Sequence, residues 1–151
     1  MTSMFRPAPG LLALLFALAA PIAAAAQSLD NLSGGWKLDR PASTFGPGDP
    51  GSERLDFVIS PTEVTVIKAA LSQYVPESVW KLALDGSPPP PPRIGSATQV
   101  DDTLVITHVR RNETVTHVYR VVGDILRVER TVRWADGRDD FTHTMVYRKI
   151  G

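Results

Sequence analysis

The chain has 151 residues and carries no formal net charge, because 16 lysines and arginines balance 16 aspartates and glutamates. A nucleic-acid-binding domain usually presents a strongly basic surface, so this balance argues against nucleic acid as a partner. The sequence contains no cysteine, which excludes disulfides and cysteine-linked lipids and leaves the fold to be stabilised by its core.

Residues 1–26 have the pattern of a secretion signal. Arg6 precedes an apolar run at 11–20, and small residues up to Ala26 suit cleavage by a signal peptidase. The run is shorter than the roughly 20 apolar residues that a membrane-spanning helix needs. We therefore expect a cleaved Sec-type signal, a periplasmic or secreted protein without stable membrane insertion, and a single domain over residues 27–151. A retained N-terminal anchor is the alternative.

The first half of the expected domain alternates between strand patterns and turns. A strand is predicted at 34–39, followed by a long surface loop at 40–53 that is rich in proline and glycine. Residues 54–60 and 63–69 form a hairpin with one apolar face, and a further strand at 78–85 alternates in the same way. The apolar positions of these three strands are Leu55, Phe57, Ile59, Val64, Val66, Trp80, Leu82 and Leu84.

Three stretches leave alternatives open. Residues 70–77 could hold a short helical turn. The prolines at 88–92 predict a stiff, extended connector, with recruitment of a proline-reading partner as the alternative. A strand at 94–100 faces inward through Ala97 and Gln99 if the loop that follows has two residues, but through Val100 if that loop has three.

Residues 103–149 contain four alternating runs, and the turns between them determine how the runs pair. Two-residue loops at 111–112, 123–124 and 136–137 put successive strands in register. One row across the four strands then contains Ile106, His117, Arg130 and His143. The rows on either side of it contain Leu104, Tyr119, Val128 and Met145, and His108, Val115, Val132 and Phe141. A last row contains Val121, Leu126 and Tyr147. Since the opposite face is mostly threonine, arginine and acidic residues, these rows should point inward.

Together the patterns predict an all-β domain of about 8–10 strands in an antiparallel up-and-down meander. Closing such a meander into a barrel removes the exposed edge strands, and a barrel of this size encloses space for one small ligand. A barrel is therefore the preferred architecture. An open or sandwich-like meander is the alternative.

Short motifs in the chain resemble those of lipocalins and of calycin barrels in general. Gly34-x-Trp36 in the first strand and Arg148 in the last are similar to a pair that closes one end of those barrels, where the arginine packs over the tryptophan ring. A longer series resembles small secreted bacterial lipocalin-like proteins of unassigned function: Leu38-Asp39, Ser43-x-Phe45, Asp85-Gly86-Ser87 and the strand at 102–106. The resemblance implies a lipocalin-like barrel over residues 27–151 that transports or sequesters a small hydrophobic molecule.

Arg130 is the leading candidate for ligand binding. An arginine that points into an apolar interior is costly unless an anion accompanies it, and a bound carboxylate or phosphate would supply that anion. The resemblance to fatty-acid-binding barrels implies a similar use of an internal arginine and tyrosine. The predicted ligand-binding set is Arg130, His117, His143, Tyr119, His108, Trp80, Phe141 and Met145. In the alternative reading, Arg130 lies at a barrel mouth and extends to water.

Other chemistry has less support in the sequence. His117 and His143 lie two strands apart with Arg130 between them, and no carboxylate or thiolate stands nearby on that face, so no metal site is predicted. No nucleophile or acid–base pair is evident, which favours a binding protein without a cofactor over an enzyme.

The leading hypothesis is a secreted or periplasmic protein that binds a small hydrophobic or amphipathic anionic ligand inside a β-barrel. An envelope protein-interaction module without a small ligand is the second hypothesis. A barrel enzyme, or a haem binder that uses one of the histidines, is the third.

Overall fold

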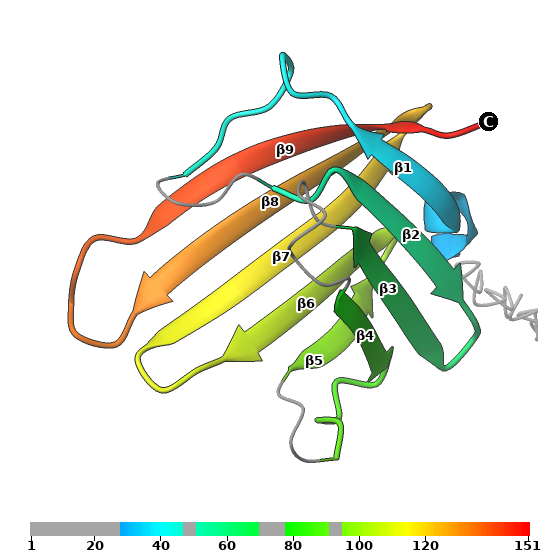
Figure 1. The fold of residues 1–151 in the computed structure, drawn as a ribbon. Helices are drawn as coiled ribbons and strands as arrows, with labels where there is room; N and C mark the ends of the chain where they lie inside the picture. The colour runs from blue at the N-terminus through cyan, green and yellow to red at the C-terminus, as the bar shows by residue number, and fades with distance from the viewer. Residues whose placement is uncertain (1–27, 47–50, 70–77, 91–94) are drawn as a thin grey trace, which may run out of the picture.

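The computed structural model describes residues 28–46, 51–69, 78–90 and 95–151 (Figure 1). The expected signal at 1–26, the uncertain stretch at 70–77 and the prolines at 91–92 lie outside the described residues.

The described chain contains nine antiparallel strands and one short 3₁₀ turn. The turn is η1 (Leu29–Leu32), and the strands are β1 (Gly34–Leu38), β2 (Arg54–Ile59), β3 (Glu63–Ala69), β4 (Ser78–Ala83), β5 (Ser96–Val100), β6 (Thr103–Val109), β7 (Glu113–Val122), β8 (Ile125–Trp134) and β9 (Phe141–Lys149). Their order in the sheet is β4-β3-β2-β1-β9-β8-β7-β6-β5, so the first and last strands of the chain are neighbours.

The sheet curls into a nearly closed barrel. In Figure 1 the long strands β6 to β9 form one wall, and β2 to β4 cross in front of it. The two ends of the sheet, β4 and β5, meet on the lower side of this view, where a bridge joins Asp85, just after β4, to Thr98 of β5. The predicted fold class, an all-β antiparallel barrel with almost no helix, is therefore confirmed in the described part of the chain.

The predicted register of the C-terminal strands is confirmed. Ile106 pairs with His117, His117 with Arg130, and Arg130 with His143. The rows on either side are also as predicted, and their residues face inward. The connection between β8 and β9 differs from the expected two-residue loop: residues 135–140 lie outside both strands, although the register across them is unchanged.

The loop between β5 and β6 resolves the ambiguity at 94–100. Val100 pairs with Thr103, so the loop has two residues, and Ala97 is buried while Val100 is exposed. The N-terminal hairpin pairs as predicted, with Phe57 opposite Val66.

The described part of the predicted surface loop over residues 40–53 lies outside the strands and is exposed or half-buried, as predicted, but its first part is hydrogen-bonded to β9. The Thr44 backbone N–H donates to the Thr144 carbonyl oxygen at 2.7 Å, and the Val146 N–H donates to the Ser43 hydroxyl at 2.9 Å. The segment after β1 therefore continues along β9 in the direction of β1, as the cyan trace beside that strand shows in Figure 1. Phe45, at its end, packs against the core.

One end of the barrel is closed around Trp36, as the resemblance implied, but with a different cation. The Trp36 indole donates to the Leu32 carbonyl oxygen at 2.8 Å, and Lys149 Nζ lies 4.6 Å from the centre of its ring. Arg148 instead lies on the outer face and pairs with Asp39 at 2.8 Å. The expected packing of Arg148 over the ring is thus wrong, and the next residue, Lys149, takes that position. Successive residues of a strand point to opposite faces, so Arg148 points outward where Lys149 points toward the ring.

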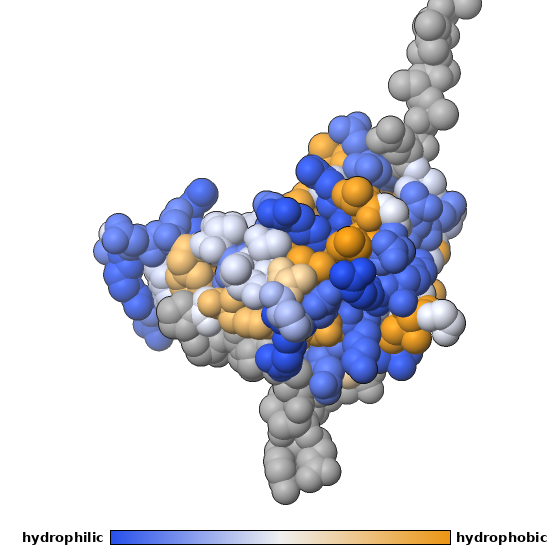
Figure 2. Space-filling view, turned by 90° about the horizontal axis from the view of Figure 1, so that it is seen from above, coloured by the Kyte–Doolittle hydropathy of each residue, from blue (hydrophilic) through white to orange (hydrophobic). Residues whose placement is uncertain are grey.

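The outer surface is mostly polar. Figure 2 shows hydrophobic residues in several groups separated by hydrophilic ones. The large hydrophobic residues that are exposed include Val58, Val79, Val100, Val109, Val122 and Ile150. Within the described residues, no helix has the length and apolar character needed to cross a membrane.

Candidate functional site

A small cavity lies in the barrel interior beside Arg130. Its volume is about 40 Å³, and its walls come from strands β2, β3, β7, β8 and β9 and from the segment before β2. The lining residues are Gly51, Ser52, Leu55, Lys68, His117, Tyr119, Val128, Arg130, Met145 and Tyr147. Such a space holds a few water molecules or one small polar group, whereas pockets for whole drug-sized ligands are roughly 300–1,000 Å³.

Half of the predicted ligand-binding residues line this cavity. Arg130, His117, Tyr119 and Met145 are in its wall. The other four, His108, Trp80, Phe141 and His143, lie outside the lining. The structure therefore brings the predicted row together, but the cavity occupies only part of it.

Lys68 is a lining residue that the sequence reasoning missed. It follows Val64 and Val66 on the inward face of β3 and pairs with Leu55 of β2. Its Nζ atom lies 3.4 Å from the centre of the Trp80 ring. Its inward position could have been predicted from the sequence, because side chains two residues apart in a strand point to the same face and Val66 points inward.

Two residues that line the cavity each carry a buried polar atom that has no hydrogen-bond partner within the described part of the structure. These atoms are the Tyr119 hydroxyl and Nδ1 of His117. Burial raises the pKa of the Tyr119 hydroxyl, which keeps it protonated and able to donate a hydrogen bond. A buried polar atom without a partner is costly, so both atoms favour a polar occupant of the cavity.

His117 is held in its neutral form. Burial lowers its pKa well below the ordinary histidine value, and the positive charges of Lys68 and Arg130, followed by those of His108 and His143, lower it further. A neutral imidazole offers one N–H donor and one acceptor nitrogen. The ring could therefore hydrogen-bond to a ligand through Nδ1 in either tautomer.

Aromatic rings fill much of the space around the cavity. Trp80 lies 4.2 Å from His108 and 5.5 Å from His117, measured between ring centres, and Phe57 packs edge-on against Tyr119 at 5.3 Å. Trp80 and Phe57 therefore pack behind two residues of the cavity wall, His117 and Tyr119.

Phe141 and His143 are covered by the segment after β1. Their rings stack at 5.9 Å, and a methyl group added to Gly46 would lie only 2.7 Å from Nδ1 of His143. The Gly46 backbone therefore packs closely against these two rings.

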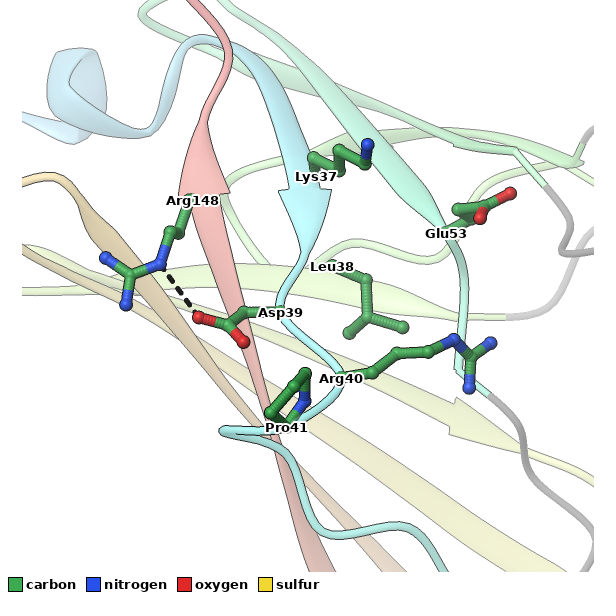
Figure 3. A pocket seen from close by; sticks show the side chains of 7 residues that line it. All are labelled: Lys37, Leu38, Asp39, Arg40, Pro41, Glu53 and Arg148. Atoms are coloured by element: carbon green, nitrogen blue, oxygen red, sulfur yellow. Dashed lines mark hydrogen bonds and ion pairs between the residues drawn. The ribbon is translucent and has the colours of Figure 1, made fainter.

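A larger depression lies on the outside of the barrel, where β1 ends (Figure 3). It measures about 370 Å³ and is lined by Lys37, Leu38, Asp39, Arg40, Pro41, Glu53 and Arg148. Most of these side chains are charged and exposed, and Arg148 is already paired with Asp39. Solvated charges explain this depression without a ligand, so the smaller interior cavity is the stronger candidate site.

The described residues contain no group of three or more histidines, cysteines, aspartates or glutamates arranged to hold a metal ion.

Comparison with known protein families finds no match, and neither does comparison with curated protein sequences. Solved structures do match. The wild-type fluorescent protein UnaG is 18% identical with a TM-score of 0.59, over 82% of this chain and 100% of that one. A Schistosoma mansoni fatty acid binding protein, in complex with arachidonic acid, is 14% identical with a TM-score of 0.58, over 82% and 99%.

A third match is secretory abundant heat soluble protein 4 from Ramazzottius varieornatus. It is 13% identical with a TM-score of 0.55, over 83% of this chain and 98% of that one. At these identities the likeness shows the fold alone. The fold is that of the fatty-acid-binding-protein and lipocalin-like calycin barrels.

Proposed function

We propose that this protein binds a small amphipathic anion, with the anionic headgroup in the interior cavity beside Arg130. The observation that carries the proposal is the composition of the cavity wall. Arg130 and Lys68 bring positive charge to it, and the Tyr119 hydroxyl and His117 Nδ1 bring two buried polar atoms without hydrogen-bond partners among the described residues.

An anionic headgroup would interact with all of these groups together. A carboxylate or phosphate accepts two parallel hydrogen bonds from an arginine fork, and such charge-assisted bonds are roughly twice as strong as neutral ones. The Tyr119 hydroxyl would donate a further bond. Leu55, Val128 and Met145 form an apolar part of the same wall, against which the first carbons of a ligand tail would pack.

The cavity volume limits what can enter without rearrangement. About 40 Å³ accommodates a headgroup, so a longer tail requires side chains to move. Met145 is suited to this because an unbranched thioether changes rotamer at little cost. Gly51 and Ser52, which lie outside the strands, form another part of the wall, and the tail would leave there.

The fold likeness is consistent with this use of the interior. One structural relative is a fatty acid binding protein in complex with arachidonic acid, and its barrel matches most of this chain. With the predicted signal at 1–26, the proposal is a periplasmic or secreted protein that binds its ligand without changing it chemically.

Titration with 8-anilinonaphthalene-1-sulfonate, an amphipathic anion that fluoresces in apolar surroundings, tests the proposal. We expect saturable binding to the wild type and roughly tenfold weaker binding to Arg130→Gln, because a charge-assisted pair is lost. Arg133→Gln, on the outer face of the same strand, is the matched control and should bind as the wild type does. Equal binding by Arg130→Gln, or no binding by the wild type, would contradict the proposal.

A role as an envelope protein-interaction module is the second candidate. The observation in its favour is that rings such as those of Trp80, His108 and Phe57 fill much of the interior. Cross-linking in cells that captures one dominant protein partner, together with no binding of the fluorescent anion, would support it instead.

A further inference from the structure

Lys68 and Arg130 reach the same cavity from two different walls of the barrel. Lys68 is in β3 and Arg130 is in β8, and strands β2, β1 and β9 lie between them in the sheet. Both residues nevertheless line one space of about 40 Å³. Barrel closure therefore brings together two cations that neither the sequence nor a flat sheet would place side by side.

The side chain of Lys68 is directed inward by its packing. It is half-buried, and its Nζ lies over the face of Trp80, whose ring also contacts His108 and His117. A cation over an indole face is attracted by the ring's negative charge density. This contact holds the ammonium group inside the barrel, beside the cavity.

The charge of Lys68 acts on another residue of the cavity wall. This charge lowers the pKa of His117, in addition to the effect of burial and together with the charge of Arg130. The two cations therefore act on one point in the interior.

The donors in the cavity wall come from three strands. The Arg130 guanidinium is on β8, the Lys68 ammonium on β3 and the Tyr119 hydroxyl on β7. A carboxylate has two oxygens in one plane and a single negative charge, whereas a phosphate monoester has three terminal oxygens in different directions and a charge of about −1.5 to −2. Donors that converge from several sides suit the second geometry.

We infer that Lys68 is the second cationic arm of the headgroup site and that, with Arg130, it selects a phosphate monoester over a carboxylate. This inference rests on the proposed function, because it concerns the ligand class of the same cavity.

Isothermal titration with dodecyl phosphate and with dodecanoate, both below their micellar concentrations, tests the inference. The tails are identical, so the difference in affinity reports the headgroup. We expect the wild type to bind the phosphate roughly tenfold more tightly. Lys68→Gln should remove this preference and leave dodecanoate binding within about threefold of the wild type.

The matched control is Lys81→Gln, on the outer face of β4 beside Glu63, which should change neither affinity. If Lys68→Gln fails to fold, Lys68→Met keeps the apolar stem and should show the same loss of preference. Equal wild-type affinity for the two ligands, or an equal loss of both in the Lys68 variants, would overturn the inference and leave the proposed function standing. Failure of the wild type to bind either ligand would overturn both.

Discussion

Replacing Tyr119 by phenylalanine should stabilise the protein and weaken its binding of anions. The side chain is 1% exposed, and its hydroxyl has no hydrogen-bond partner in the described structure. Leaving such a group buried costs about 1–3 kcal/mol, and phenylalanine removes that cost while it keeps the ring contact with Phe57. Allowing for the lost packing of the oxygen atom, we expect a gain of about 1 kcal/mol in the free energy of unfolding.

For a domain of this size, that gain corresponds to a rise in Tm of about 3–5 °C. Urea unfolding of the ligand-free protein gives the free energy, and titration with dodecanoate should show an affinity about tenfold lower, since the hydroxyl no longer donates to the headgroup. The combination of higher stability and weaker binding is what distinguishes a binding group from a structural one.

Tyr147→Phe is the control for this experiment. The Tyr147 hydroxyl is also buried, but it donates to the Met145 sulfur at 3.8 Å, so its removal should cost about 0.5–1.5 kcal/mol. A loss of 1 kcal/mol or more in Tyr119→Phe would show that the Tyr119 hydroxyl is satisfied in the folded protein, and would refute the reasoning.

Three further changes have definite expected outcomes. The folded protein holds His117 at a lowered pKa, so the unfolded chain binds more protons than the folded one as the pH falls below about 6.5. The free energy of unfolding should therefore decrease by up to about 1.4 kcal/mol for each pH unit below that value. In His117→Gln, urea unfolding at several pH values should show a smaller decrease per pH unit. Gly51→Ala should lower the free energy of unfolding by about 2 kcal/mol, because φ is +72° and the new methyl would lie 3.1 Å from the Met145 sulfur. Gly137→Ala is the control: φ is +79° but no atom lies near the new methyl, so only the backbone strain of about 1 kcal/mol should be lost. Thermal unfolding measures both. Trp36→Ala should cost about 3–5 kcal/mol by the same measurement, and a loss below 1 kcal/mol would show that this ring does not close the barrel.

The register of the C-terminal strands could be predicted because two local rules determine it. Turn residues such as Gly123, which has φ +64°, set where each hairpin reverses, and the two-residue period then assigns every side chain to a face. The pairing of His117 with Arg130, and of Arg130 with His143, followed from these rules alone. No contact between distant parts of the chain was needed.

The features that the sequence did not reveal all depend on such distant contacts. Lys68 and Arg130 line the same cavity only because the sheet closes into a barrel. The segment around Thr44 hydrogen-bonds to β9, although its sequence lacks the apolar–polar alternation that predicts a strand. Lys149 rather than Arg148 lies over the Trp36 ring because the pairing of β1 with β9 places Lys149 opposite Trp36. How far aromatic rings fill the interior depends on their rotamers, and the alternation of apolar and polar residues does not determine rotamers.

The pairing of the first strand with the last has a consequence for how the protein is made. Ser43 and Val146, which bond across this junction, are 103 residues apart. At about 5–20 residues per second, a ribosome needs roughly 5 to 20 s to add the second after the first. Throughout that interval the apolar side of β1 to β3 lacks the strands that cover it in the folded barrel, and we expect a chaperone to protect the nascent chain until β9 has been added.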